Sequence, residues 1–225
     1  MTGNVVLDAY AGRAEEYTAL LGSMDNTHES DQRLVARWAR DLRGAVIDAG
    51  CGPGHWTDFL KKRGVDAEGI DQVQTFIVQA RKRFPAVPFR VASLGDLKVR
   101  DGYAAAILAW YSVIHLAPSD LPTVLREFAR CIAPGGSLLL GFFEGDTVEP
   151  FPHAVTTAYF WPIGEMSTQL EAAGFHVHAV NTRTDPGKRS HAAIIAHRID
   201  GSAPTSSDAD SAKEHQRSES NQPVS

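Results

Sequence analysis

Cysteine is scarce in this chain, because Cys51 and Cys131 are the only two among 225 residues. Two cysteines do not make a disulfide framework, and neither stands in a spacing typical of a zinc site, so no metal site is expected. Positive charge is not in excess either, since 22 Lys and Arg face 27 Asp and Glu for a net charge of −5. The composition therefore lacks the basic footprint of a nucleic-acid-binding protein.

Long apolar runs are also missing. The longest, which contains AAAILAWY at residues 104–111, falls far below the roughly 20 residues that cross a bilayer. The stretch MTGNVVLDAY at residues 1–10 lacks the charged and then apolar pattern of a signal peptide. We therefore expect a soluble, cytoplasmic protein without a membrane partner.

A third deficit concerns only the last part of the chain. Residues 200–225 contain no Phe, Tyr or Trp and almost nothing apolar. Such a segment buries too little surface to offset the entropy cost of ordering it, so it is predicted to be a disordered hydrophilic tail. Residues 1–199 have the size of a single domain with one core.

In residues 1–199, short apolar runs alternate with segments of helical periodicity. Runs that are apolar on both faces, as in parallel strands covered by helices, lie at 45–49, 65–70, 87–92, 104–110, 137–143, 175–180 and 192–197. The helical stripes are Leu34/Trp38/Leu42, Trp56/Leu60, Phe76/Ala80/Phe84, Leu121/Leu125/Phe128/Ile132 and Met166/Leu170. Ser119 is expected as the N-cap of the fourth helix, with Pro122 in its first turn, and Gly174 as the left-handed cap of the fifth. The pattern predicts a doubly wound, Rossmann-like α/β fold with a mostly parallel seven-stranded sheet, an antiparallel last strand and helices on both faces.

The stretch VIDAGCGPGHWTDFL at residues 46–60 places Gly50, Gly52 and Gly54 on alternate positions between the first strand and the helix after it. Glycines at this junction let backbone amides and a helix N-terminus approach a ligand at the carboxyl edge of the sheet. Asp71 ends the second strand, 21 residues after Gly50, where a carboxylate is placed to accept both hydroxyls of a ribose. Together these features predict a nucleoside-containing cofactor. His55 replaces the third glycine of the dinucleotide fingerprint, and no P-loop is present.

The motif VIDAGCGPG resembles motif I of the class I S-adenosylmethionine-dependent methyltransferases, and further segments resemble the same family in the same order. They are DAYAGRAEEY near residue 10, GIDQ with Asp71, LREFARCIAPGGSLLLGFF and MSTQLEAAGFHV. The resemblance covers about residues 7–198. Within the family, the chain looks most like small stand-alone actinobacterial enzymes. It implies S-adenosyl-L-methionine as the cofactor.

The resemblance also implies roles for individual residues. Loop amides would take the carboxylate of the cofactor, while Asp48 and backbone carbonyls hold its ammonium group. The turn ASLGDL at residues 92–97 would meet the adenine, although Ser93 stands where many relatives carry Asp. Trp110 is either a core residue or part of the wall around the positively charged sulfonium. The expected cofactor-binding residues are Asp48, Gly50, Cys51, Gly52, Gly54, Asp71, Gln72, Ser93, Leu94 and Trp110.

Two histidines are candidates for the catalytic step. His115 follows the fourth strand, where the methyl group points in the family, and is either a packed or capping residue or a general base. His153 lies in the long segment 144–165, with Glu144, Tyr159 and Trp161, at the edge where a substrate cover belongs. Both cysteines are expected to be structural.

The expected function is methyl transfer from S-adenosylmethionine to a small-molecule acceptor by in-line displacement, with an O, N, S or C acceptor atom left open. Three alternatives stay open at this point. They are a methyltransferase acting on protein or nucleic acid, a non-catalytic binder of S-adenosylmethionine, and a dinucleotide-dependent oxidoreductase. The acidic net charge disfavours nucleic acid as a partner, and the oligomeric state is not predicted.

Overall fold

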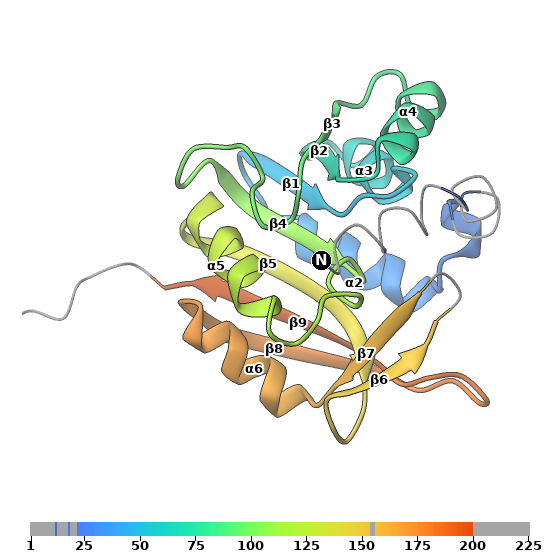
Figure 1. Ribbon diagram of the computed structural model, residues 1–225. Helices are drawn as coiled ribbons and strands as arrows, with labels where there is room; N and C mark the ends of the chain where they lie inside the picture. Colours follow the sequence, from blue (N-terminus) through green and yellow to red (C-terminus); the bar gives the residue numbers. More distant parts are fainter. Residues whose placement is uncertain (1–11, 13–17, 19–21, 154–155, 200–225) are drawn as a thin grey trace, which may run out of the picture.

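A computed structural model of the chain describes residues 12, 18, 22–153 and 156–199 (Figure 1). Its centre is a parallel sheet in the order β3-β2-β1-β4-β5. The strands are β1 (Ala45–Ala49), β2 (Asp66–Asp71), β3 (Phe89–Val91), β4 (Ala104–Trp110) and β5 (Ile132–Glu144). The order reverses beside β1, so the loops after β1 and β4 meet at the carboxyl edge, where ligands of doubly wound sheets bind.

The last two strands form the antiparallel part of the sheet, as predicted. β9 (His191–Arg198) pairs with the free edge of β5, and β8 (Phe175–Arg183) pairs with β9. The connection between β8 and β9 is too short for a crossover helix, so the chain reverses and β9 runs against its neighbours. This geometry brings His191 level with Phe143 on β5.

The segment expected as a cover loop contains two more strands, which raises the strand count to nine. β6 (Glu149–Pro152) and β7 (Thr157–Trp161) form an antiparallel pair. β7 also pairs in parallel with the last two residues of β5, beyond the point where β4 ends. This strand pair has an apolar face, because its side chains Phe151, Ala158 and Trp161 are buried.

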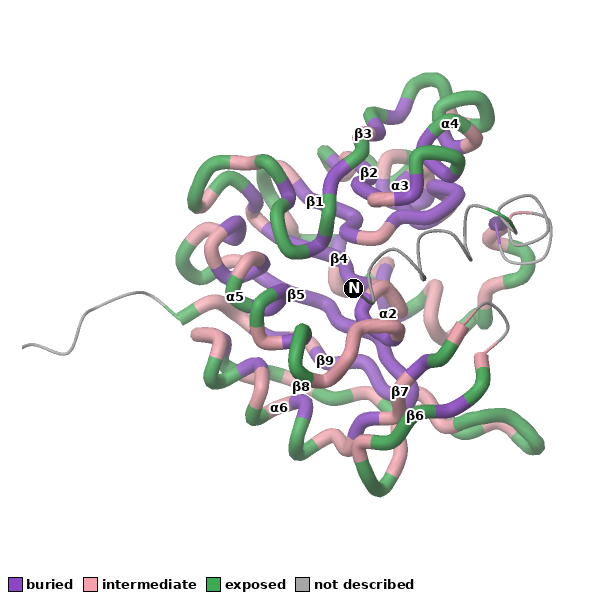
Figure 2. Tube along the Cα trace, viewed as in Figure 1, coloured by how far each residue is buried: buried purple, intermediate pink, exposed green. Residues whose placement is uncertain are grey.

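Helices cover both faces of the sheet, because alternate strand residues point to opposite sides. On one face, α2 (Glu29–Ala39) and α3 (His55–Lys61) pack on the side that includes Val46 and Leu108. On the other, α5 (Leu121–Cys131) and α6 (Ile163–Ala172) pack on the side that includes Ile47 and Ile107. In Figure 1, α5 and α6 lie in front of the sheet and α2 behind it. Figure 2 shows how completely the central strands are buried between these layers.

Two more helices belong to the described part. α4 (Gln74–Arg83) packs beside β2 and β3, where Ile77 and Ala80 contact Phe89. η1 (Met24–Asn26) is a single 3₁₀ turn before α2. None of the described helices is long and apolar enough to span a bilayer.

Several predicted element boundaries need correction. Asp120, not Ser119, is the N-cap residue of α5, and Ser119 contacts the Asp120 carboxylate instead of capping the helix. Pro122 does lie in the first turn, and Gly174 adopts the left-handed conformation just after α6. α2 ends before Leu42, and Phe84 is the C-cap of α4. The predicted tail, 200–225, lies outside the described residues.

Candidate cofactor and acceptor site

The glycine loop runs from the end of β1 to the start of α3, and its three glycines have positive φ angles of 78°, 51° and 84° at Gly50, Gly52 and Gly54. The amides of Gly50 and Cys51 donate to the Ile70 carbonyl at 2.7 and 3.0 Å, which ties the loop to the end of β2. The left-handed region disfavours every residue with a Cβ, so the backbone path itself demands glycine at these positions.

The surroundings of the three glycines differ. A Cβ on Gly50 would lie 2.3 Å from the Cβ of Ser112, and one on Gly54 would lie 2.6 Å from the Phe89 ring. A Cβ on Gly52 would meet no atom within 4 Å. Gly50 and Gly54 are therefore required by close packing inside the protein, whereas Gly52 borders open space that a ligand can enter.

Asp71 lies directly beside this open space. Its carboxylate accepts the Gly52 amide at 2.9 Å and the Val73 amide at 2.8 Å, so it joins the glycine loop to the start of α4. Burial raises the pKa of Asp71, and the backbone hydrogen bonds oppose that rise. A carboxylate has about four acceptor positions, and the backbone amides of Val73, Gly52 and Gln72 contact this one, so acceptor capacity remains for a hydroxyl donor of a ligand.

Asp48 is the second buried carboxylate of the loop region. The hydroxyl of Thr57, on α3, donates to it at 2.6 Å. Burial raises the pKa of Asp48 from its ordinary 3.8 to about 7, and the nearby charge of Asp71 adds to the rise. A cation placed next to Asp48 would reverse this shift, because an opposite charge favours the ionised form. The buried thiol of Cys51 has its pKa raised well above its usual range, so it is not a reactive nucleophile.

A cavity of about 220 Å³ is lined by Gln72, the residue that follows Asp71 in the sequence. It brings together three residues predicted from sequence, Gln72, Ser93 and Leu94, with Leu116 and the first turns of α5. Leu94 is buried while Ser93 is exposed. Asp96 accepts hydrogen bonds from Lys98 and is a turn residue. The mixture of apolar walls and a few polar groups is typical of a site for a planar ring.

Four side-chain atoms in the described part of the chain are buried without a hydrogen-bond partner: His55 Nδ1, Ser112 Oγ, His153 Nδ1 and Arg183 Nε. His55, Ser112 and Arg183 follow or end strands that run parallel to β1, and the ring of His153 lies 5.2 Å from that of His115. Buried polar atoms in native proteins usually have a partner. These atoms keep unused hydrogen-bonding capacity for a ligand or for water.

An aromatic cluster forms the other side of the edge. Tyr111 follows β4 with a φ of 55°, a strained value for a residue with a side chain. Its hydroxyl is hydrogen-bonded to His191 Nδ1 at 2.5 Å, and its ring lies 5.1 Å from that of Phe143. Burial raises the pKa of Tyr111 and lowers that of His191, so both groups stay neutral.

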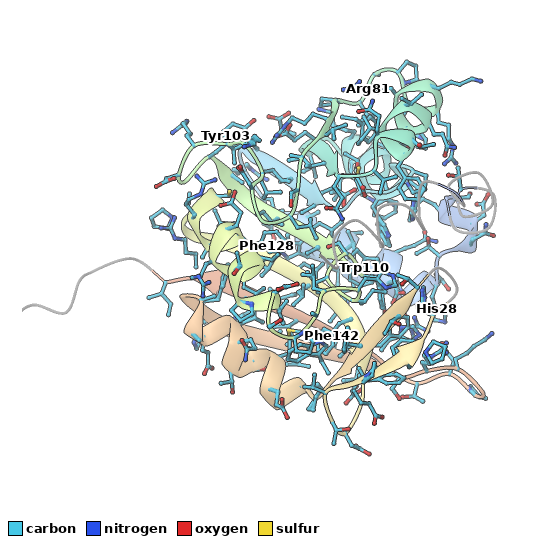
Figure 3. All side chains as sticks on the ribbon, in the orientation of Figure 1. His28, Arg81, Tyr103, Trp110, Phe128 and Phe142 are labelled. Carbon is cyan, nitrogen blue, oxygen red and sulfur yellow. The ribbon has the colours of Figure 1, made fainter. Side chains whose placement is uncertain are left out.

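Trp110, at the carboxyl end of β4 (Figure 3), packs 5.5 Å from Trp56 and lies over Gly141. With Tyr111 and His191 it lines a cavity of about 120 Å³ that also includes the Asp31–Arg183 ion pair. Trp110 therefore lies apart from the cavity of Gln72, Ser93 and Leu94.

His115 and His153 face each other across the aromatic cluster, with ring centroids 5.2 Å apart. His115 Nδ1 lies 2.7 Å from the Thr157 carbonyl, which can only accept, so this nitrogen carries the hydrogen. The neutral ring then keeps its basic lone pair on Nε2. Burial lowers the pKa of His115, and it lowers that of His153 to about 4, helped by the charges of His115 and Arg189. In the described residues, no group of three or more His, Cys, Asp or Glu side chains is arranged to hold a metal ion.

Residues 46–136 match a protein family described as a methyltransferase domain. Trans-aconitate 2-methyltransferase of Methylobacterium nodulans is 34% identical over 111 residues, 47% of this chain and 40% of the relative. A probable S-adenosylmethionine-dependent methyltransferase of Mycolicibacterium smegmatis is 30% identical over 155 residues, 65% of this chain and 56% of the relative. The chain thus spans about half the length of these curated relatives. Among solved structures, 1,6-didemethyltoxoflavin-N1-methyltransferase of Burkholderia thailandensis has a TM-score of 0.72 at 18% identity, covering 88% of each chain.

Residues 46–136 thus match a methyltransferase domain, and the whole fold is similar to that of the Burkholderia thailandensis methyltransferase. The predicted Rossmann-like fold class is confirmed, and the match agrees with the methyltransferase family predicted from the sequence. The residues of the site also fit S-adenosylmethionine. Gly52 borders open space, and the Asp71 carboxylate beside it keeps acceptor capacity. The cavity lined by Leu94 lies where the chain leaves β3.

Three further residues of the site, Thr57, Ser112 and His191, were not predicted from sequence. Thr57 holds Asp48, Ser112 packs against Gly50, and His191 holds Tyr111. Only the helical turn at Thr57 left a local signal, because it lies close to the glycine loop in the chain. Ser112 and His191 reach the site through strand pairing between distant parts of the chain, which no local pattern reveals.

Proposed function

We propose that the protein transfers a methyl group from S-adenosylmethionine to a small-molecule acceptor. The observation that carries the proposal is the buried Asp71 carboxylate, held by the Gly52 amide next to open space. The names of two similar proteins add support, since one is a trans-aconitate 2-methyltransferase and the other a 1,6-didemethyltoxoflavin-N1-methyltransferase. Both names specify small-molecule acceptors.

In this proposal, each cofactor-binding residue holds a different part of the cofactor. Asp71 accepts the ribose hydroxyls, the cavity of Gln72, Ser93 and Leu94 encloses the adenine, and the ionised Asp48 faces the ammonium group. The unpartnered Ser112 Oγ, which packs against Gly50, is available to the amino-acid part of the cofactor. When bound, the cofactor would supply a methyl group on a sulfonium; an acceptor atom would take this methyl group in line with the breaking bond to sulfur, and S-adenosylhomocysteine would be the leaving group.

The acceptor then lies over Tyr111, Phe143 and the pair His115–His153. The protein aligns the acceptor atom, and alignment alone lowers the barrier by several kcal/mol, on the order of 7–11 in favourable cases. For a hydroxyl, phenol or thiol acceptor, Nε2 of His115 accepts the proton, because Nδ1 is already committed to Thr157. An amine with a free lone pair needs no base.

Binding and turnover are tested separately. S-adenosylhomocysteine is expected to raise the Tm of the full chain, whereas NADH and NADPH are not. Asp71→Asn should reduce the shift, and Asp66→Asn, at the exposed start of the same strand, should keep it. Stabilisation by a nicotinamide dinucleotide instead would favour the oxidoreductase alternative.

Turnover is tested by incubating the protein with methyl-labelled S-adenosylmethionine and fractions of a metabolite extract. The expected result is a labelled small molecule together with an equal amount of S-adenosylhomocysteine. Binding of the cofactor without product from any metabolite fraction, or labelling confined to protein or nucleic acid fractions, would contradict the proposal of a small-molecule acceptor.

A further inference from the structure

A basic groove lies on the outer side of α2, away from the proposed cofactor site. The arginines Arg33, Arg37 and Arg40 line it from α2, and Arg63 lines it from the end of α3. Its other lining residues are Ala36, Ala39 and Val65. The groove encloses about 520 Å³, which is within the size range of sites for small ligands.

The arginines of the groove have few counter-charges. Arg33 pairs with Glu29, one turn earlier on α2. In the described part of the chain, no carboxylate lies within 4.0 Å of the guanidinium of Arg37, Arg40 or Arg63. This cluster of one sign occurs in a chain whose net charge is −5. A basic residue near the end of a helix is stabilised by the helix dipole, but that effect does not require four arginines to converge on one groove.

The geometry of the cluster is fixed by rigid elements. Positions 33, 37 and 40 are spaced by four and three residues, so their side chains leave the same side of the helix. Arg63 is held separately, with its guanidinium carbon 3.4 Å from the centroid of the Phe59 ring and its Nη1 donating to the Phe59 carbonyl at 3.1 Å. The small side chains of Ala36 and Ala39 keep the space between the arginines open.

We propose that this groove binds the oligophosphate group of a small molecule. The planar fork of arginine matches the oxygens of a phosphate and donates to them in pairs. Several guanidinium groups around one concavity neutralise the several charges of a di- or triphosphate. A long nucleic acid fits less well, because the acidic remainder of the protein repels a polyanion that extends beyond the groove.

The part of the groove around Arg40 and Arg63 is separate from the site of methyl transfer, whereas Arg37 also lines the cavity of Trp110, Tyr111 and His191. The first turn of α2 lies at the carboxyl edge of the sheet, where Asp31 pairs with Arg183 at the end of β8. Arg40 and Arg63 lie at the opposite edge, shortly before β1 and β2 begin. With a rise of about 1.5 Å per residue, α2 spans roughly 16 Å between the two. A ligand in the groove is therefore a second ligand and not the methyl acceptor.

The test is a calorimetric titration of the full chain with sodium tripolyphosphate at about 0.15 M salt, where weak surface attraction is screened. The double variant Arg40→Gln/Arg63→Gln should bind at least about tenfold more weakly, because two charge-assisted contacts are lost. The matched control is Lys82→Gln/Arg126→Gln, which removes the same charge from exposed positions on α4 and α5. The control should bind tripolyphosphate like the wild type, and all three proteins should keep their affinity for S-adenosylhomocysteine.

Four outcomes would overturn the proposal. Tripolyphosphate does not bind the wild type, or the control variant loses as much affinity as the groove variant. Tripolyphosphate competes with S-adenosylhomocysteine, which places it at the carboxyl edge. A DNA oligonucleotide binds more tightly than tripolyphosphate with the same dependence on Arg40 and Arg63, which assigns the groove to nucleic acid. None of these outcomes depends on turnover, so failure of the proposed methyl transfer leaves this test intact.

Discussion

Asp71 has a structural task, because its carboxylate accepts the amides of Gly52 and Val73, and in the proposed function the same carboxylate also holds a ribose. Asp71→Asn is expected to weaken S-adenosylhomocysteine binding by about 1.5–3 kcal/mol, the usual range for a lost hydrogen bond to a charged group. Isothermal titration calorimetry measures the change, with Asp66→Asn as the control on the same strand. Affinity equal to that of the wild type would remove Asp71 from the ribose site.

Asp48 makes the stability of the protein depend on pH. The pKa of Asp48 is about 7 in the folded protein and lies near 3.8 as an ordinary value, so between them the folded state binds more protons than the unfolded state. The contribution of Asp48 therefore favours folding most below about pH 4 and is lost as the pH rises through 7.

Asp48→Asn removes this dependence while keeping an oxygen that accepts the Thr57 hydroxyl. We expect the free energy of unfolding of the variant, relative to the wild type, to increase between pH 5 and pH 8, as measured by urea denaturation. Asp66→Asn, at an exposed position, should show no such trend. A constant difference for Asp48→Asn across this pH range would contradict the raised pKa.

His115 is the residue on which the proposed proton transfer depends. If the acceptor carries an O–H or S–H group, His115→Ala should lower kcat by about a hundredfold while cofactor affinity stays unchanged. Because burial lowers the pKa of His115, kcat of the wild type should rise with pH to a plateau, with its midpoint below the ordinary 6.5. This pH dependence of kcat should disappear in His115→Ala. It should remain in His176→Ala, which changes an exposed histidine of β8. Unchanged kcat in both His115→Ala and His153→Ala would leave alignment as the whole mechanism.

Different glycines of the glycine loop are expected to matter for folding and for ligand binding. Gly50→Ala places a Cβ 2.3 Å from the Ser112 Cβ, so it should lower the Tm by at least about 5 °C. Gly52→Ala meets no neighbour and costs only the strain of a positive φ, about 1–2 kcal/mol. Its methyl group points into open space, so it should weaken S-adenosylhomocysteine binding more than it lowers stability.

Gly164→Ala is the matched control, since Gly164 lies in α6 with no atom near its would-be Cβ. An alanine suits a helix better than glycine, so this variant should keep or raise the Tm. Thermal unfolding and cofactor titration of the three variants test the distinction. Wild-type affinity in Gly52→Ala would mean that the open space is not where the ligand binds.

The segment after β5 shows where prediction of elements from local pattern failed. Residues 144–165 contain aromatics without a helical or strictly alternating period, and this pattern predicts a cover loop. The structure forms β6 and β7 there, because β4 ends at Trp110 and leaves the last residues of β5 without a partner on that edge. The formation of β7 therefore depends on where β4 ends, and β4 is distant in the sequence.

The last described strand of the molecule, β9, is paired on both sides before residue 200 is reached. β9 ends at Arg198 on a ladder with β5 and β8, and the Ile199 amide donates to the Gly174 carbonyl at 2.9 Å. Deletion of residues 203–225 should therefore leave both Tm and turnover unchanged, since that segment has almost nothing apolar to bury. Differential scanning calorimetry and the labelled-methyl assay measure the two properties, and a drop of several degrees or a loss of turnover would show that the segment docks on the domain.

The sequence by itself determined the features that depend on neighbours along the chain. Apolar runs and helical stripes located the strands and helices, and the glycines at 50, 52 and 54 with Asp71 identified the cofactor family. A turn that needs positive φ, or a carboxylate at a strand end, leaves a local signature that survives in the sequence. The antiparallel hairpin β8–β9 was predictable for the same reason, because the short connection between its strands excludes a crossover.

Only the tertiary structure decided which distant residues meet. Pairing of β1 with β4 brings Ser112 against Gly50, and pairing of β5 with β9 brings His191 to Tyr111. It also gave the three glycines of the loop different roles, since what each would-be Cβ meets depends on β2, β3 and β4. The arginines of α2 and α3 likewise become one groove only when the helices pack on the same face of the sheet. Such contacts are products of sheet register and helix packing, and these are set by the burial of the whole core rather than by any local pattern.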